Sequence, residues 1–224
     1  MITSPRGNVE LFEDFTRDNV TNLVETVAST GTQDIRNKHG GWWRQYMTAT
    51  DTDAAMIAGE VCWEVDEGHP LIMEVRLLVT DVDVASVFVG MSDANTETEA
   101  LVIEDEDGTL NSVAADAFGF LLEGEQTTDP VQAWQAVGVD TDVDKTQAVV
   151  PNSGAADSVV QTLRLEANPN SSGSVLHFIN GKLELSKTSW FDSSIVYVPV
   201  VNCDARNTAY YADYDYIYVC APRS

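Results

Sequence analysis

The chain has 224 residues, with 12 Lys or Arg against 36 Asp or Glu, so its formal net charge at pH 7 is −24. A surface of this sign repels phosphate backbones, which excludes DNA and RNA as partners. No apolar run approaches the roughly 20 residues that cross a bilayer as a helix, so no membrane partner is expected, and residues 1–15 lack the apolar centre of an export signal.

An all-β chain of roughly 200–250 residues commonly folds as one domain, so we expect one compact unit. Residues 1–40 are the least patterned and are predicted to form an N-terminal arm or edge strands, with a β-sandwich over residues 41–224. Within the arm, residues 19–29 fit a helix or a strand, and their β-branched content favours a strand. Beyond the arm, short apolar stretches cut by Gly, Asn, Asp and Pro predict strands over residues 71–79, 84–91, 117–124, 131–139, 158–167, 174–180, 194–202 and 214–220.

Two of these stretches, 71–79 and 84–91, are almost continuously apolar, which predicts central strands with both faces covered. Polar segments between the strands predict loops, and the acidic run Glu104–Asp107 before Gly108 indicates a solvated turn. The loops are expected over residues 31–41, 93–99, 104–111, 123–130, 140–145 and 168–173.

One hairpin has a register that follows from its own sequence. Asn180-Gly181 is the strongest two-residue turn signal, because both positions tolerate positive φ. A two-residue turn also fixes which residues face each other on the two strands. The expected pairs are Ile179 with Lys182, Phe178 with Leu183, His177 with Glu184 and Leu176 with Leu185.

The cysteines and histidines give no site. Cys62, Cys203 and Cys220 are too few and too scattered for a disulfide framework. Buried free thiols are therefore expected, although Cys203 and Cys220 would meet if they lay on neighbouring C-terminal strands. The three histidines are His39, His69 and His177. They lack the paired spacing of metal ligands, so no transition-metal site is expected.

Carboxylates are plentiful, yet they do not form a catalytic pattern. A retaining glycosidase needs two carboxyl groups about 5–5.5 Å apart, which alternation along one strand provides through Glu-x-Asp followed by a third acid. The chain has one such start, Glu64-Val65-Asp66, but Gly68 and His69 occupy the third position. The sequence also has no Gly-x-Ser-x-Gly nucleophile elbow and no glycine-rich phosphate loop.

One acidic segment resembles the start of a calcium loop. Asp140, Asp142 and Asp144 alternate, so their carboxylates are able to converge on one hard cation. An EF-hand loop next requires a glycine, where this chain has Lys145, and a later Glu, where it has Pro151. An exposed acidic turn is the favoured interpretation.

Aromatic side chains give the best argument for binding. Alternation in the terminal stretch places Tyr214, Tyr216 and Tyr218 on one face of a strand. Such a ladder stacks on sugar rings or anchors a protein if it is exposed, and fills a sheet core if it is buried. In the pair Trp42-Trp43, alternation buries one ring and leaves the other for an interface.

Two stretches together resemble a known fold family. HFINGKLEL (177–185) resembles the x-x-N-G-x-x hairpin of concanavalin A-like lectin and glucanase sandwiches, and YDYIYV (214–219) resembles the closing D-Y-V-R-V-Y strand of their laminarinase-like members. This resemblance implies an all-β, two-sheet antiparallel jelly-roll sandwich. In that family the catalytic acids lie on a mid-chain strand, and their motif is missing here. The resemblance therefore implies the fold without hydrolase activity.

A second resemblance bears on function. FEDF (12–15), FVGMSD (88–93), FGFLLEG (118–124) and VQAWQAVGV (131–139) are similar to segments of virion proteins of tailed bacteriophages, which carry such sandwiches as capsid decoration, or cement, modules. This similarity implies a non-enzymatic structural protein on the outer surface of a phage head. It would be made in the host cytoplasm, bind the major capsid protein and form a homo-oligomer, with a trimer as the working guess.

These observations assign no catalytic, cofactor-binding or metal-binding residue, and no cofactor is expected. Phe12 and Phe15 are the expected capsid anchors, so deleting residues 1–20 is predicted to abolish capsid binding without unfolding the sandwich. The alternative is a lectin-like carbohydrate-binding module with a glycan partner. A third hypothesis, a degenerate glycoside hydrolase, needs Glu64 and Asp66 in a cleft with a third acid nearby.

Overall fold

Strands make up the regular structure in the part of the chain that the computed structural model describes. They pair antiparallel into two sheets, which confirms the predicted two-sheet antiparallel sandwich. No helix among these residues is long and apolar enough to cross a membrane. The described residues are 9–16, 23–36, 41–59, 63–65, 70–94, 101–106, 109–124, 133–141, 143–144, 148–150, 154–168 and 173–221.

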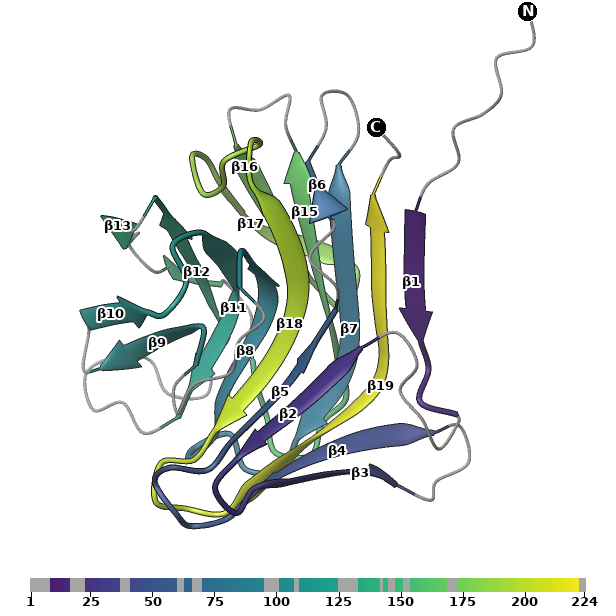
Figure 1. Cartoon of the computed structure of the whole chain (residues 1–224), viewed down its shortest axis with the longest axis vertical. Coiled ribbons are helices and arrows are strands. Elements are labelled where there is room, and N and C mark those ends of the chain that lie inside the picture. Colours follow the sequence, from purple (N-terminus) through teal and green to yellow (C-terminus); the bar gives the residue numbers. More distant parts are fainter. Residues whose placement is uncertain are drawn as a thin grey trace, which may run out of the picture.

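The first sheet, sheet A, contains the terminal strand and the Asn-Gly hairpin. Its central strands β7 and β15 alternate between buried and partly exposed residues, so one face packs in the core and the other meets solvent. Strand β1 pairs with β19 at an edge, as Figure 1 shows on the right. The strand order is β17 (Lys182–Lys187), β16 (Ser174–Ile179), β15 (Gln161–Asn168), β7 (Leu71–Val79), β19 (Tyr210–Ala221), β4 (Trp42–Met47) and β3 (Thr32–Arg36), with β1 (Val9–Glu13) beside β19.

The central strands of the second sheet, sheet B, are buried on both faces, whereas its edge strand β2 (Val24–Ala28) is largely exposed. Strands β5, β8 and β11 are buried at every residue. The strand order is β13 (Val143–Asp144), β12 (Gln135–Asp140), β11 (Ala117–Glu123), β8 (Ser86–Ser92), β18 (Val196–Asp204), β5 (Ala54–Ala58) and β2 (Val24–Ala28), with β14 (Ala148–Val149) beside β12 and β6 (Trp63–Glu64) beside β18.

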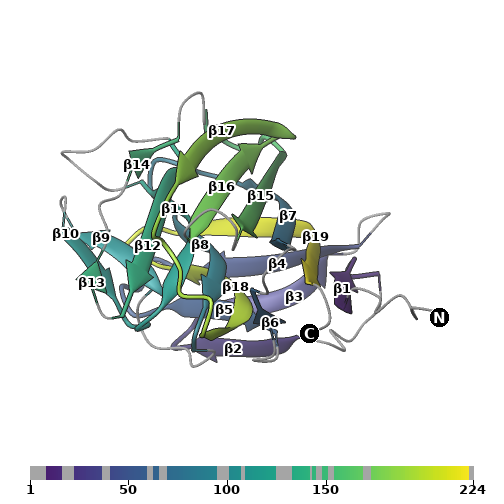
Figure 2. The ribbon, with the colours of Figure 1, turned by 90° about the horizontal axis from the view of Figure 1, so that it is seen from above.

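A separate hairpin covers central strands of sheet B on the side away from sheet A. It consists of β9 (Ile103–Glu106) and β10 (Thr109–Ser112). Figure 2 shows it on the side of β11 and β12 that faces away from β15 and β16. The main core therefore lies between the two sheets, and a second apolar cluster lies between sheet B and the hairpin. We call the face under the hairpin the outer face of sheet B.

The structure corrects three expectations about strands and loops. Segment 84–91 forms β8 with both faces covered, as expected, but 71–79 forms β7 with one face partly exposed. The expected loop over 31–41 contains β3. The expected loop over 104–111 forms most of the β9–β10 hairpin, because the apolar residues 101–103 that precede it pack on sheet B. In residues 19–29, the favoured strand is confirmed as β2, and residues 19–22 lie outside the described part.

The predicted register of the Asn-Gly hairpin is confirmed next to the turn, but it is wrong farther from the turn. Asn180 and Gly181 have φ of 51° and 78°, and Phe178 pairs with Leu183 as predicted. Beyond that pair a β-bulge at Glu184 shifts the register, so His177 faces Leu185 and the predicted pairing of Leu176 with Leu185 is wrong. An extra residue on one strand displaces each pair that follows it.

A second bulge divides the tyrosine ladder. The register of β19 against β7 shifts between Tyr214 and Tyr216, leaving Asp215 as the extra residue. Tyr214 is therefore fully buried in the core, together with Ile217. Tyr216 and Tyr218 are partly exposed on the outer face of sheet A. The prediction that all three tyrosines share one face is wrong, because a bulge reverses the alternation.

Two glycines allow an unusually close approach between β8 and β11. Gly90 pairs with Gly119 across the strands. A Cβ atom on Gly119 would lie 2.5 Å from the backbone oxygen of Val89 and 3.0 Å from Cε2 of Phe88. A Cβ atom on Gly90 would lie 2.3 Å from the backbone oxygen of Phe118. Because Gly90 and Gly119 have no side chains, the Phe88 ring packs directly against their backbone under the hairpin.

We therefore predict that Gly119→Ala lowers the free energy of unfolding by about 1–3 kcal/mol, the usual cost of overpacking a filled site. Urea unfolding followed by tryptophan fluorescence measures this change. Ser186→Ala, at an exposed position of β17, is the control and should change stability by less than about 0.5 kcal/mol. Equal effects of the two substitutions would contradict the close packing.

Candidate functional site

The β9–β10 hairpin packs on sheet B through apolar side chains. Leu101, Val102 and Ile103 are fully buried and belong to the cluster that includes Phe88 and Leu121 of sheet B. Such residues contribute about 1.5–3 kcal/mol each when fully buried. Apolar burial is thus the main force that holds the hairpin down.

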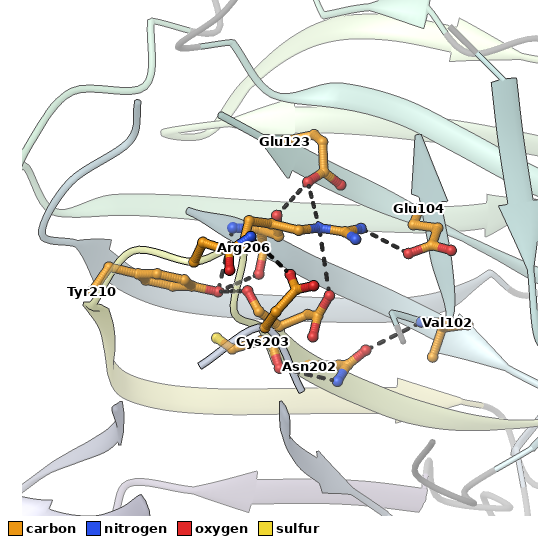
Figure 3. Close-up of polar contacts among 11 residues, drawn as sticks. Val102, Glu104, Glu123, Asn202, Cys203, Arg206 and Tyr210 are labelled. Atoms are coloured by element: carbon orange, nitrogen blue, oxygen red, sulfur yellow. Dashed lines mark hydrogen bonds and ion pairs between the residues drawn. The ribbon is translucent and has the colours of Figure 1, made fainter. Parts of the chain in front are cut away.

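A polar cluster holds the same hairpin at one end of sheet B (Figure 3). Ser86 pairs with Glu123 on one side and with Asp204 on the other, so the two acids stand in one row across three strands. Arg206 Nη2 donates to Glu104 Oε2 of the hairpin at 2.7 Å. Arg206 Nε lies 3.4 Å from Glu123 Oε1 and 3.5 Å from Asp204 Oδ2.

Three carboxylates thus share one guanidinium, and this imbalance affects their ionisation. Burial raises the pKa of Glu123 to about 7, although Arg206 and the Ser86 hydroxyl oppose the shift. Burial also raises the pKa of Asp204 to about 7, with Glu123 and Glu104 adding to the shift and Arg206 opposing it. Partial burial works against the charge on Arg206, but the three acids together raise its pKa.

The cluster is closed to a substrate in this arrangement. The side chains of Glu123 and Asp204 are 3% and 2% exposed. A glycoside hydrolase needs both carboxyl groups to reach the sugar and its attacking water. Here both groups face Arg206, so the arrangement serves to hold the hairpin.

The predicted carboxylate candidates lie elsewhere. Glu64 is exposed on β6 at the edge of sheet B. Asp66, Gly68 and His69 lie outside the described residues. The mid-chain strand β11 carries no row of acids on the face toward the hairpin. The residues on that face before Glu123 are Ala117, Gly119 and Leu121.

No metal centre is found in the described residues, among which no three His, Cys, Asp or Glu side chains gather to hold an ion. In the predicted calcium-like segment, Asp142 lies outside the described part, and so do His39 and Cys62. Cys203 and Cys220 are buried free thiols, as predicted.

His177 lies in the core and contacts two aromatic rings edge-on. Its ring centroid lies 5.1 Å from that of Phe120 and 5.7 Å from that of Trp190. Burial lowers its pKa to about 3. His177 is therefore a neutral core residue at ordinary pH.

Aromatic rings and an arginine form an exposed surface on sheet A, which we call the outer aromatic surface: Phe12, Trp42, Arg76, Tyr216 and Tyr218. The Phe12 ring is 5.8 Å from Tyr216 and 6.4 Å from Tyr218. The Arg76 guanidinium lies 5.8 Å from the Trp42 ring centroid and pairs with Asp215. Phe12 remains 57% exposed, which leaves an apolar group available for contact.

The other predicted anchor, Phe15, is not available. It is fully buried and stacks on Trp43 with ring centroids 5.9 Å apart. The burial expected for the tryptophan pair is confirmed, since Trp43 is buried and Trp42 is partly exposed. An interface at Trp42 stays a prediction.

Sequence reasoning missed the polar cluster. The run Glu104–Asp107 looked like a solvated turn, whereas Asp105 is buried and Glu104 pairs with Arg206. One signal was present, because Glu123 and Asp204 each end an apolar run in which a charge is costly without a partner.

Comparison with solved structures places the chain in the concanavalin A-like fold. It is similar to the β-glucanase of Bacillus licheniformis, with TM-score 0.62, 14% identity, and coverage of 94% of this chain and 97% of that one. It is also similar to the Emp47p carbohydrate recognition domain, with TM-score 0.64, 12% identity, and coverage of 96% and 95%.

A third similar structure comes from a virus. It is a conserved carbohydrate esterase of the Shiga toxin-encoding bacteriophage phi24B, with TM-score 0.55, 16% identity, and coverage of 91% of this chain and 92% of that one. Fold neighbours thus include both carbohydrate-recognition proteins and enzymes. No protein-family model matches the chain. No curated protein matches it in sequence.

We predict that His177 makes the fold sensitive to acid. Its pKa is about 3 in the native state and about 6.5 when unfolded, so the unfolded chain binds more protons between these values. Stability due to the neutral ring is therefore lost as pH falls from about 6.5 toward 3. His177→Leu should lose less unfolding free energy than the wild type between pH 6.5 and 4 in urea titrations. Equal losses would contradict this role.

Proposed function

We propose that this protein is a non-catalytic binding protein that decorates the outside of a tailed-phage head. The observation that carries the proposal is the outer aromatic surface, which presents Phe12, Tyr218 and Arg76 to solvent. Aromatic residues and arginine are the side chains enriched at the energetic centres of protein interfaces. Glu123 and Asp204 of sheet B are buried beside the hairpin and take no part in this contact.

The proposed partner is the major capsid protein, reached from the virion exterior after synthesis in the host cytoplasm. A homo-oligomer, such as a trimer at a symmetry axis, would engage several capsid subunits at once. Linked contacts of this kind raise overall avidity without new chemistry. The similarity to a structure from a bacteriophage supports a viral setting for the fold, at 16% identity.

The structure changes how the N-terminal segment should be tested. Deleting residues 1–20 removes β1 from sheet A and also takes Phe15 out of the core. That deletion therefore mixes loss of binding with loss of stability. A point substitution at Phe12 separates them, because its side chain is exposed.

We predict that Phe12→Ala weakens binding to phage heads at least 30-fold, from a loss of about 2 kcal/mol at an interface centre. Co-sedimentation with heads of the phage that encodes the chain, stripped of this protein, measures the affinity. Val24→Ala is the matched control, since Val24 is an apolar residue 50% exposed on β2 of the other sheet. Unchanged binding by Phe12→Ala, or equal losses in both variants, would reject the outer aromatic surface as the capsid contact.

A carbohydrate-binding function is the second candidate. It is favoured by the shared fold of a carbohydrate recognition domain and by the partly exposed rings of Tyr216 and Tyr218. The Tyr216 hydroxyl donates a 2.6 Å hydrogen bond to Glu74, which fixes the ring on the surface. Fixed aromatic rings with nearby polar groups provide contact area at low entropic cost.

This alternative predicts binding of the wild type to at least one sugar on a glycan array. Tyr218→Ala should abolish that signal by removing the ring, and Val24→Ala should keep it. An array without any bound glycan would reject the alternative and leave the capsid proposal untouched, because the two use different partners.

A further inference from the structure

Besides its apolar contacts and a backbone hydrogen bond from Asp105 to Glu123, the hairpin β9–β10 is attached to sheet B by two side-chain anchors. Asn202 on β18 accepts a hydrogen bond from the backbone amide of Val102 at 3.1 Å, and it donates to the backbone oxygen of Ala55 at 3.3 Å. The second anchor is the ion pair between Glu104 and Arg206. The first anchor carries no titratable group, whereas the second belongs to the acid cluster.

The second anchor belongs to a cluster with more acidic side chains than basic ones. Glu123 and Asp204 flank Ser86 in one row, and Arg206 is their cationic partner among the described residues. Asp204 Oδ1 is buried and has no hydrogen-bond partner in that part of the chain. If Glu123, Asp204 and Glu104 were all ionised, the three carboxylates and the one guanidinium would carry a net charge of −2 in a largely buried cluster. Burying such a charge is costly.

Other titratable groups surround the two acids. Glu104 of β9 and Asp51 add negative charge nearby, and the backbone amide of Asp105 donates a hydrogen bond to Glu123 that opposes the rise of its pKa. Cys203 of β18 and Tyr210 of β19 lie on the core side of sheet B; burial raises the pKa of Cys203 to about 12 and raises that of Tyr210 well above its ordinary value. Both stay neutral up to pH 8.5, so Glu123 and Asp204 are the groups that change charge near neutrality.

We propose that the β9–β10 hairpin is a pH-sensitive lid on the outer face of sheet B, held closed while Glu123 and Asp204 keep protons and loosened when both ionise. Opening would let water reach the two carboxylates and would relieve their mutual repulsion. It would also expose the apolar strip of Phe88, Leu121 and Val137, which the hairpin covers. The lid lies on the sheet opposite the outer aromatic surface, so this inference is independent of the proposed function.

The direction of the effect follows from proton linkage. Glu123 and Asp204 have pKa values of about 7 in the closed state. In water the same groups have values of about 4, so the closed state binds more protons between pH 4 and 7. Raising the pH therefore favours the open state. The free energy that these groups contribute to closing is present in full below about pH 4, decreases as the pH rises from about 4 to 7, and is lost above about pH 7. Each carboxyl group should raise the opening constant about tenfold between pH 6 and 8.5.

Hydrogen exchange measured by mass spectrometry tests the lid on the full-length protein. Labelling times are corrected for the chemical exchange rate at pH 6 and pH 8.5. Amides of residues 101–106 and 109–114 should lose protection by at least tenfold at pH 8.5, while amides of β7 and β15 keep theirs. The double variant Glu123→Gln/Asp204→Asn should show no such change with pH, since its side chains do not titrate.

Two controls separate titration from simple loosening. Asn202→Ala removes the non-titrating anchor and should lower hairpin protection by a similar factor at both pH values. Glu10→Gln/Asp34→Asn removes a matched pair of exposed acids from sheet A and should keep the wild-type pH response. Unchanged hairpin protection in the wild type overturns the proposal, and so does a parallel loss in β7 and β15, which would mean global destabilisation. A wild-type response in the double variant overturns it as well.

Discussion

Apolar contact between the β9–β10 hairpin and sheet B decides which faces of the sandwich are open. Leu101 and Ile103 are fully buried against a sheet whose outward positions include Phe88 and Val137. At about 1.5–3 kcal/mol for each buried aliphatic side chain, this packing offsets much of the cost of ordering a short hairpin. The burial of Glu123 and of the outward positions of β8 and β11 depends on it.

The two sheets consequently have different roles. Sheet B buries Glu123 and Asp204, and burial together with one shared arginine sets their ionisation. Sheet A keeps an exposed outer face on which charges are paired, as in Arg76 with Asp215 and Arg164 with Glu166. For a chain with a net charge of −24, a face of paired charges and aromatic rings offers a partner the least repulsion. Binding through sheet A is therefore the mode that we propose.

Features set by adjacent residues were predictable from the sequence, and features set by distant ones were not. The Asn180-Gly181 turn follows from two residues that tolerate positive φ. The bulges at Glu184 and Asp215 escaped prediction, because one extra residue reverses every later side chain without changing the composition of the strand. The hidden role of Glu104 depends on Arg206, which lies 102 positions away along the chain. The two-sheet fold was predictable, whereas the site required the three-dimensional pairing.

Thiol accessibility tests the central claim, that the outer face of sheet B is closed and the outer face of sheet A is open. Val137→Cys places a thiol under the hairpin, and Phe12→Cys places one on the outer aromatic surface. With a maleimide at pH 6.5, the account predicts rapid labelling at position 12 and labelling at position 137 that is slower by orders of magnitude. Both variants are made in a Cys62→Ser background, in which the remaining native thiols at Cys203 and Cys220 are buried and serve as the slow reference. Equally fast labelling at positions 12 and 137 would contradict the account.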